Sequence, residues 1–345
     1  RWAGSACRGK SADPAAGPNL PAAQVRFPVL SVGEMKGPTA FAGLSNDGVR
    51  AQIAARMGDY GAGRGALAPS RWLEKFRTAF NNPTGSAEQL ITFDNIAIAI
   101  AEYERSATFA DSPWARYVRG DNGAITDTAK QGALVFFRTT AQGGGQCAQC
   151  HRGDLFSDER HVVVGFPQVG PGFGDGPSLD DDFGRERQSG VADDRYRFRT
   201  PSLLNVELTA PYGHSGAYPD LFTAIRHYVL PDDTVASFLQ DRTWCSLPSF
   251  VGTDCGGQFA AVRRNSLASL ARVTDLRVLA PQDTFPQVDN TQFSPTVNGQ
   301  VQQFLRALTD PCLLDRNCFG RWIPRPDEAP DEHQLNATNA SGSPL

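Results

Sequence analysis

Methionine is scarce in this sequence: only Met35 and Met57 occur among its 345 residues. Long apolar runs are also missing. The longest, residues 96–101, is far short of the about 20 residues that a transmembrane helix needs. No block of Lys and Arg forms a footprint for nucleic acid, and the formal net charge is -4. We therefore expect neither a membrane span nor DNA or RNA binding.

Glycine and proline are abundant, with 34 and 24 residues, and apolar residues make up 40%. This composition predicts a loop-rich globular protein with a buried core rather than a low-complexity chain. At roughly 100–200 residues per domain, the length predicts about two domains. The sequence begins at Arg1 with neither Met nor a signal peptide, so we expect a processed product or a fragment.

One motif points to a specific cofactor. Cys147, Cys150 and His151 form a C-x-x-C-H sequence, the attachment signature of haem c. Two thiols three residues apart reach the two vinyl groups of one haem, and the next residue presents its imidazole to the iron. The alternatives are a zinc half-site or a redox pair. Zinc would need a second ligand pair, and no other C-x-x-C exists; a redox pair would favour a βαβ context, which the glycine-rich approach at residues 143–145 does not offer.

The other cysteines fit an oxidising compartment. Haem c is attached outside the bacterial cytoplasm, so we expect a periplasmic or secreted protein in which disulfides form. Cys245 with Cys255, and Cys312 with Cys318, are close enough in sequence to close short loops. Four free thiols are the alternative. Cys7 is left without a partner in this sequence.

Helical patterns dominate the chain. Apolar spacing predicts helices over residues 46–57, 70–80, 93–103, 126–137, 220–228, 260–270 and 295–308. Residues 152–200 and most of 229–295 are predicted to be loop, and strand signals are few. The fold class is therefore mainly α. The acidic run at residues 180–182 is most simply a solvated loop, with the docking of a basic partner as the alternative.

The second axial ligand of the haem is restricted by residue counts. His151 is the proximal ligand, and the usual distal partners are Met or His. No Met follows Met57, so the haem domain has no Met of its own to offer. The remaining candidates are His161, His214, His227, His333, Tyr196, Tyr212, Tyr218 and Tyr228.

Helical spacing separates two neighbours among these candidates. In residues 220–228, Tyr228 shares an apolar stripe with Leu221, Ala224 and Ile225, whereas His227 lies off that stripe. A phenolate is an anionic ligand that favours high oxidation states of iron. The other interpretation makes Tyr228 an ordinary buried aromatic residue.

The segment from residue 93 to residue 229 resembles the bacterial dihaem cytochrome c peroxidase and MauG family. The order and spacing of its pieces carry the resemblance, which covers roughly residues 20–310. The matching stretches are residues 98–106, 129–132 with Phe136, the C-A-Q-C-H motif with Gly153, 198–203 with Asn205 and Val206, and 208–216.

The resemblance implies roles for several residues. Classical peroxidases of the family place the distal Met seventeen residues after the proline that matches Pro211, which is the position of Tyr228, and the MauG branch has Tyr there. Backbone carbonyls matching those of Thr209 and Pro211 help to bind a Ca²⁺ in the family. His214 matches a family histidine near the haems, with a core histidine in a turn as the alternative.

The N-terminal region departs from the family, because the first C-x-x-C-H motif is missing. Gln24 and Glu34 nevertheless resemble the distal-pocket Gln and Glu of the first haem, with the same ten-residue spacing. Solvated loop residues are the alternative. We expect a second haem to be carried by a missing N-terminal segment or another chain. A one-haem descendant is the alternative. Trp2 resembles the family's inter-haem Trp, although its spacing differs.

Together these features predict two cytochrome c-like haem domains with long loops, the N-terminal one incomplete. The predicted boundaries are 1–107 for the remainder of the N-terminal domain, 108–125 for a linker, 126–323 for the C-terminal haem domain and 324–345 for a flexible tail. The resemblance implies a haem c-dependent oxidoreductase that uses H₂O₂, with Glu34 as acid/base and Gln24 orienting the peroxide. Its expected partner is an electron-donor protein, or a protein or small molecule that it oxidises. The alternative is a monohaem electron carrier or a haem subunit of a larger complex.

Overall fold

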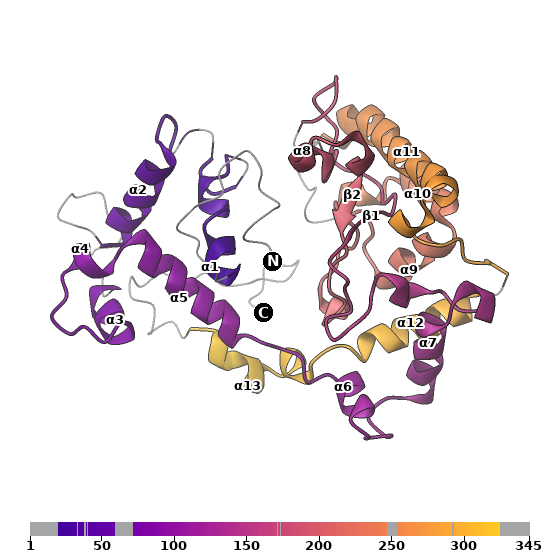
Figure 1. Cartoon of the computed structure of the whole chain (residues 1–345), viewed down its shortest axis with the longest axis horizontal. Coiled ribbons are helices and arrows are strands. Elements are labelled where there is room, and N and C mark those ends of the chain that lie inside the picture. The colour runs from indigo at the N-terminus through magenta and orange to yellow at the C-terminus, as the bar shows by residue number, and fades with distance from the viewer. Residues whose placement is uncertain are drawn as a thin grey trace. The chain divides into compact units, whose positions relative to one another are not determined.

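The computed structural model describes residues 20–324 except 33, 38, 40, 59–71, 171, 173, 247–253 and 292. The chain divides into two compact units, and each is described here by itself. Unit 1 comprises Arg1–Thr108 with Arg316–Leu345, and unit 2 comprises Phe109–Asp315. Helices dominate the described part of both units (Figure 1). No described helix has the length and apolar character to cross a bilayer.

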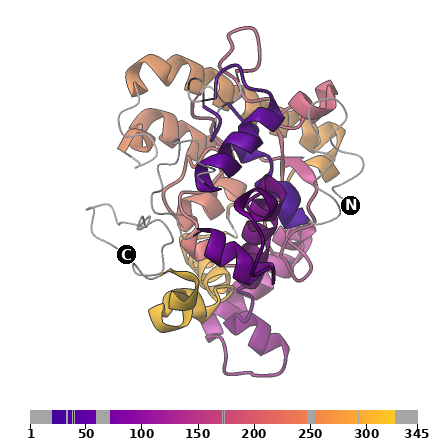
Figure 2. The same cartoon turned by 90° about the vertical axis from the view of Figure 1, so that its left-hand side faces the viewer.

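In unit 1, helices α1 and α2 pack against α5, and α3 packs against α2 and α4 (Figures 1 and 2). The Thr92 hydroxyl caps α5 by accepting from the backbone N–H of Asn95. Its buried face carries Phe93, Ile96, Ala97 and Ala101. The bounds of its helices are α1 Leu20–Val25, α2 Asn46–Gly58, α3 Trp72–Ala79, α4 Ala87–Leu90, α5 Phe93–Ser106 and α13 Arg316–Phe319.

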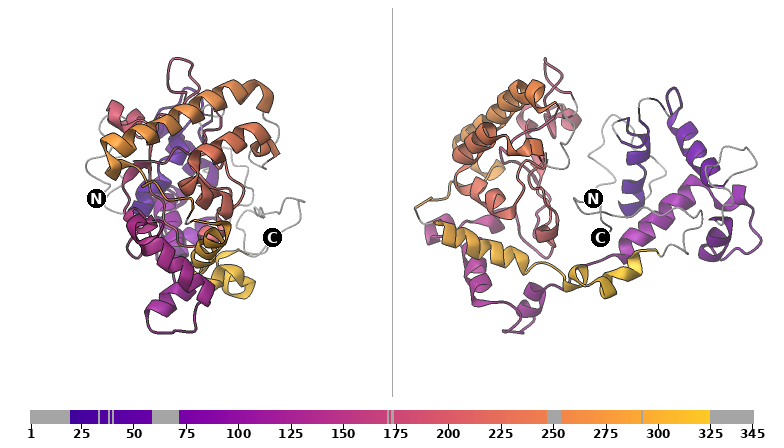
Figure 3. Two further views of the ribbon diagram at one scale, coloured as in Figure 1. Left: turned by 90° about the vertical axis from the view of Figure 1, so that its right-hand side faces the viewer. Right: turned by 180° about the vertical axis from the view of Figure 1, so that it is seen from behind.

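Unit 2 holds the larger core and a two-stranded antiparallel sheet, β1 His161–Val163 with β2 Arg197–Arg199. Helices α10 and α11, the long helix in orange, pack together in both views of Figure 3. The bounds of the helices are α6 Pro113–Val118, α7 Asp127–Phe137, α8 Glu186–Ser189, α9 Leu221–Val229, α10 Pro231–Asp241, α11 Cys255–Leu279 and α12 Pro295–Arg306.

The centre of unit 2 is the contact of α12 with α7 and α9. The rings of Phe136 and Phe304 lie 5.0 Å apart between α7 and α12. Gly132 makes this approach possible, because a Cβ at that position would overlap the Gln300 carbonyl oxygen. The chain segments on either side of the haem motif are thereby held against one another.

The structure differs from the predicted linker over residues 108–125. These residues contain α6, and Trp114 packs its ring 4.9 Å from that of Phe304. The backbone N–H of Trp114 also donates to the backbone carbonyl of Ala307. This segment therefore belongs to unit 2 from Phe109 onward, while the chain from Arg316 belongs to unit 1.

Two helices differ from their predicted extent. Residues 231–241 were predicted as loop but form α10, which Pro231 opens and whose first turn carries Asp232 and Asp233. Helix α11 extends beyond the predicted 260–270 at both ends, and part of its buried face is polar. Ser266 accepts from the N–H of Gln168, and the Asn265 amide donates to the Asp180 carbonyl. Apolar periodicity does not detect such a face.

Replacing Gly132 by Ala is expected to destabilise unit 2 by about 1–3 kcal/mol, because the contact with Gln300 leaves no room for a methyl group. Urea unfolding of the holoprotein measures this change. Gly299→Ala on α12 is the matched control, since a Cβ there meets nothing within 4 Å. That variant is expected to gain about 0.5–1 kcal/mol. Equal stabilities for the two variants would contradict the close approach of α7 and α12.

Candidate functional site

The C-x-x-C-H segment is a tight turn over one wall of a cavity in unit 2. Cys147–Gln149 forms a short 3-10 helix, and the His151 N–H donates to the Cys147 carbonyl at 2.9 Å. The turn is held against α7 by the Gly145 N–H, which donates to the Val135 carbonyl at 2.8 Å. Two thiols and one imidazole are thereby presented to the same cavity.

The cavity has a volume of about 430 Å³ and mostly apolar walls. Its lining comes from α7, the C-x-x-C-H turn, the segment after β1, β2 and the loop that follows it, α9 and α12. The walls include Phe136, Val164, Phe166, Leu203, Ile225 and Val301. An enclosed apolar cavity with a few polar groups is typical of a cofactor site.

His151 is oriented for a metal ion. Its Nδ1 lies 3.0 Å from the carbonyl oxygen of Phe156, an acceptor that requires the proton on Nδ1. The lone pair is then on Nε2, as in ligating histidines whose second nitrogen bonds to a carbonyl. Burial lowers the pKa of His151, opposed by the Phe156 carbonyl, so the ring is neutral as a ligand must be.

The two thiols of the motif form no disulfide, and burial disfavours their ionisation. Both Cys147 and Cys150 are free cysteines. Burial raises the pKa of Cys147 to about 12 and also raises the pKa of Cys150. Reactive dithiols and zinc thiolates need the opposite shift. Within the described part of the chain, no cluster of three His, Cys, Asp or Glu side chains is suited to a metal ion.

Tyr228 faces the thiols from α9. It lines the cavity together with Leu221, Ala224 and Ile225, the stripe predicted from the sequence. Burial raises the pKa of Tyr228, and the nearby Cys150 and Cys147 add to this effect. Its ring lies 5.3 Å from that of Phe285 and 5.8 Å from that of Phe166. Two thiols, an imidazole and a phenol lining one cavity fit a covalently attached haem.

His227, the neighbour of Tyr228, does not line the cavity. It is fully buried, at 0% exposure, in a hydrogen-bonded site of its own. Its Nε2 lies 2.9 Å from the Val164 carbonyl, and its Nδ1 lies 2.9 Å from the Tyr218 hydroxyl and 3.0 Å from that of Thr234. Burial lowers the pKa of His227 to about 4. The helical stripe correctly separated it from Tyr228 but did not indicate that it is buried.

His214 lies at the cavity wall and is partly exposed. Its Nε2 lies 2.8 Å from Asp182 Oδ2, and its ring stacks on Phe198 with centroids 3.6 Å apart. Burial alone would raise the pKa of Asp182, but hydrogen bonds from His214 and the Gly184 N–H lower it. These contacts hold His214 in one orientation.

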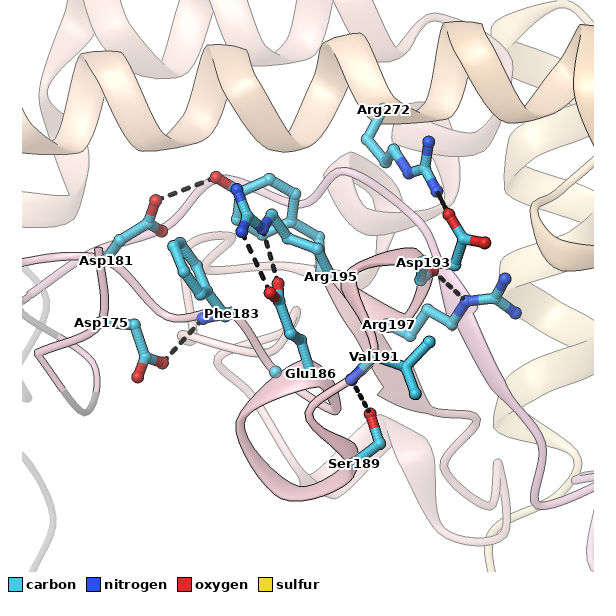
Figure 4. Close-up of polar contacts among 12 residues, drawn as sticks. Asp175, Asp181, Phe183, Glu186, Ser189, Val191, Asp193, Arg195, Arg197 and Arg272 are labelled. Atoms are coloured by element: carbon cyan, nitrogen blue, oxygen red, sulfur yellow. Dashed lines mark hydrogen bonds and ion pairs between the residues drawn. The ribbon is translucent and has the colours of Figure 1, made fainter. Parts of the chain in front are cut away.

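The acidic segment at residues 180–182 is more ordered than a solvated loop. Asp181 accepts from Tyr196, and Asp180 pairs with Arg264. Figure 4 shows the surrounding contacts, in which Arg195 makes two hydrogen bonds to Glu186, and Arg272 pairs with Asp193. The amino-acid sequence does not indicate this network, because the pairing of acidic and basic residues depends on how the loop folds back.

The remaining predicted residues fall into separate groups. Thr209 and Pro211 line the cavity. Gln24 on α1 and Glu34 in a turn are exposed residues of unit 1. A disulfide joins Cys245 to Cys255, and Cys312 and Cys318 are disulfide-bonded as well. Trp2, Cys7, His333 and the predicted tail from residue 325 onward lie outside the described residues.

Comparisons with known proteins find haem peroxidases among those similar to this chain. The family model "Di-haem cytochrome c peroxidase" matches residues 17–123. The cytochrome-c peroxidase IdrP1 of Pseudomonas sp. (strain SCT) is 32% identical over 181 residues, 46% of each chain. MauG of Methylophilus methylotrophus is 30% identical over 156 residues, 45% of this chain and 42% of that protein. These matches show that the chain is similar to dihaem cytochrome c peroxidases and to MauG proteins. It spans less than half the length of these relatives.

Solved structures share the fold of this chain. A MauG-like protein associated with microbial copper homeostasis covers 87% of this chain and 71% of its own, with a TM-score of 0.51 and 20% identity. A diheme peroxidase from Burkholderia thailandensis covers 84% of this chain and 63% of its own, with a TM-score of 0.50 and 20% identity. At such identities, the likeness concerns the fold alone.

The haem colour is expected to survive acid–acetone extraction, because thioether bonds from Cys147 and Cys150 resist it. Cys150→Ser is expected to weaken retention, since one thioether remains. The double variant Cys245→Ser/Cys255→Ser is the matched control: it removes two cysteines of the disulfide and keeps the colour. Release of the haem from the unaltered protein would refute covalent attachment.

Proposed function

We propose that the chain is part of a haem c-dependent peroxidase of the MauG type. It uses hydrogen peroxide and a haem held between His151 and Tyr228 to oxidise a partner protein or another substrate. The observation that carries the proposal is the placement of the Tyr228 phenol in the cavity that Cys147, Cys150 and His151 also line. The curated relatives are longer than this chain, so the activity of the whole protein is part of the proposal. A periplasmic or secreted location is a further part of it.

Each residue of the cavity has a distinct task. Cys147 and Cys150 tether the haem, and the His151 Nε2 is held toward its iron by the hydrogen bond from Nδ1 to Phe156. The haem supplies the redox chemistry, while the chain supplies ligation, burial and orientation. Tyr228 would offer an oxygen ligand to the haem iron, and a phenolate ligand favours the oxidised states of iron.

His214, a polar residue of this site, lies at the edge of the cavity. His214 is held at the wall by Asp182 and by the Phe198 ring. The imidazole is thereby kept at the edge of the cavity, whose other walls are mostly apolar. We assign it a supporting role in proton movement at the cavity, and not ligation, because its Nε2 is engaged with the carboxylate.

The peroxide-reacting part of the proposal lies in unit 1. Glu34 would act as acid/base and Gln24 would orient the peroxide at a first haem, which a further segment or another chain would have to supply. The match of the family model to residues 17–123 includes both positions and supports this assignment. A Ca²⁺ bound with the help of the Thr209 and Pro211 carbonyls is a further part of it.

Tyr228→Met is expected to raise the reduction potential of the haem, because a neutral thioether replaces an anionic phenolate. The oxidised state stored on this haem should be lost as well. The unaltered ferric protein should lack the near-infrared band of Met-to-iron charge transfer, which the variant should gain. Redox titration and near-infrared absorption measure these changes.

Two controls make this prediction specific. Tyr218→Phe removes a buried phenol that is bonded to His227 and should leave the haem spectrum unchanged. Substitution of His214 or His227 should not produce the spectral change that accompanies the loss of a histidine ligand. An unaltered spectrum in Tyr228→Phe, with bis-histidine features lost in either histidine variant, would refute Tyr228 as the ligand.

Glu34→Gln is expected to slow the reaction with peroxide by about 10²–10⁴-fold, the usual contribution of a general acid/base. Haem content should not change. Stopped-flow absorption with the full-length holoprotein measures the rate. Glu102→Gln is the matched control, because Glu102 is an exposed carboxylate on α5 that pairs with Arg105. Equal rates for Glu34→Gln and the unaltered protein would mean that Glu34 is a loop residue without a catalytic role.

A monohaem electron carrier is the competing function, and the single C-x-x-C-H motif of this sequence favours it. A pyridine haemochrome count on the purified full-length protein distinguishes the two. Two haems per functional unit with peroxide reactivity support the peroxidase. One haem without that reactivity supports the carrier.

A further inference from the structure

Tyr196 is a buried phenol that has no role in the proposed function. It is 5% exposed, and its hydroxyl donates to Asp181 Oδ2 at 2.9 Å. The other oxygen of this carboxylate accepts from the Asp182 N–H at 2.7 Å. A carboxylate can take up the proton of its hydrogen-bond donor, whereas a backbone carbonyl cannot. The pair is therefore arranged for proton transfer.

The backbone around Tyr196 is held firmly. Its φ of 61° is unusual for a bulky residue and is retained only where the surroundings impose it. On one side Arg195 makes two hydrogen bonds to Glu186, at 2.6 and 3.0 Å. On the other side Arg197 pairs with Asp283 at 2.9 Å. These anchors fix the phenol against Asp181.

Tyr196 is also in packed contact with the wall of the haem cavity. It shares a buried cluster with Val163, Val273, Leu276 and Phe285, and Tyr228 packs against this cluster. Phe285 lines the cavity. On the other side of the pair, Asp180 reaches the exposed Arg264, and Leu179 is exposed. The Tyr196–Asp181 pair thus lies between the cavity and the surface of unit 2.

We propose that Tyr196 and Asp181 form a redox-active pair that carries oxidising equivalents from the haem toward the protein surface. The inference rests on the proposed function, because haem oxidised by hydrogen peroxide is the oxidant. Tyr196 gives one electron to the oxidised haem, its O–H bond breaks, and the proton moves to Asp181 Oδ2. The products are a neutral tyrosyl radical, a protonated carboxyl group and a haem reduced by one electron. An electron from the substrate and the return of the proton restore Tyr196 and Asp181.

Two features separate this pair from Tyr212. Burial raises the pKa of Asp181, although the hydrogen bond from Tyr196 opposes this, so a proton on the carboxyl group costs less than usual. Tyr212 lines the cavity, but its hydroxyl bonds to the carbonyls of Val206 and Glu207, which cannot take up a proton. Tyr212 is therefore the matched control.

The test is electron paramagnetic resonance of the full-length holoprotein, frozen after mixing with hydrogen peroxide. The unaltered protein should give a radical signal that narrows when its tyrosines carry ring deuterium. Tyr196→Phe and Asp181→Asn should lose the signal, whereas Asp181→Glu, which keeps a carboxylate, should retain it. Tyr212→Phe and Tyr218→Phe should retain it as well. An unchanged ferric haem spectrum shows that each variant has assembled.

Several outcomes would overturn the inference. One is a radical signal that persists in Tyr196→Phe. This includes the case in which Tyr218→Phe, and not Tyr196→Phe, removes the signal. Another is haem oxidation by peroxide without any tyrosyl radical, which would leave the proposed function intact. If peroxide does not alter the haem spectrum of the unaltered protein at all, the proposed function fails, and the inference fails with it because no oxidant remains.

Discussion

The hydrogen bonds of His227 determine which side chain of α9 faces the haem cavity. Both ring nitrogens have partners, since Nε2 lies against the Val164 carbonyl and Nδ1 against the hydroxyls of Tyr218 and Thr234. Leaving such buried groups without partners would cost about 1–3 kcal/mol each. Because adjacent helical positions point in different directions, an anchored His227 leaves Tyr228 toward the thiols and His151. The ligand proposal depends on this arrangement.

The cavity combines apolar walls with groups that are costly to ionise there. Burial raises the pKa values of Tyr228, Cys147 and Cys150 and lowers that of His151. Burial therefore favours the neutral form of each of these four groups. Charged residues are placed outside, where Asp182 holds His214 and the ion pairs of Figure 4 brace Tyr196. This separation of apolar cavity and charged surroundings is what the proposed function and the proposed Tyr196–Asp181 pair both require.

The sequence predicted what depends on local spacing. The C-x-x-C-H turn, the stripe that ends at Tyr228 and the predominance of helices all follow from residues close together in the chain. The contacts that depend on folding were not predictable in this way. The burial of His227, the bond between Tyr196 and Asp181 across 15 residues and the polar face of α11 each join residues that no periodicity relates. Helix α10 did have a local signal for its start, Pro231 followed by two aspartates. A prediction from apolar spacing alone does not take this signal into account.

Ligation by Tyr228 is tested most directly by resonance Raman spectroscopy of the ferric holoprotein, excited in the phenolate-to-iron charge-transfer band. The account predicts phenolate ring and iron–oxygen vibrations that shift when the tyrosines carry ¹³C in the ring. These vibrations should disappear in Tyr228→Phe and persist in Tyr218→Phe. A spectrum without phenolate vibrations, or one that Tyr228→Phe leaves unaltered, would contradict the account.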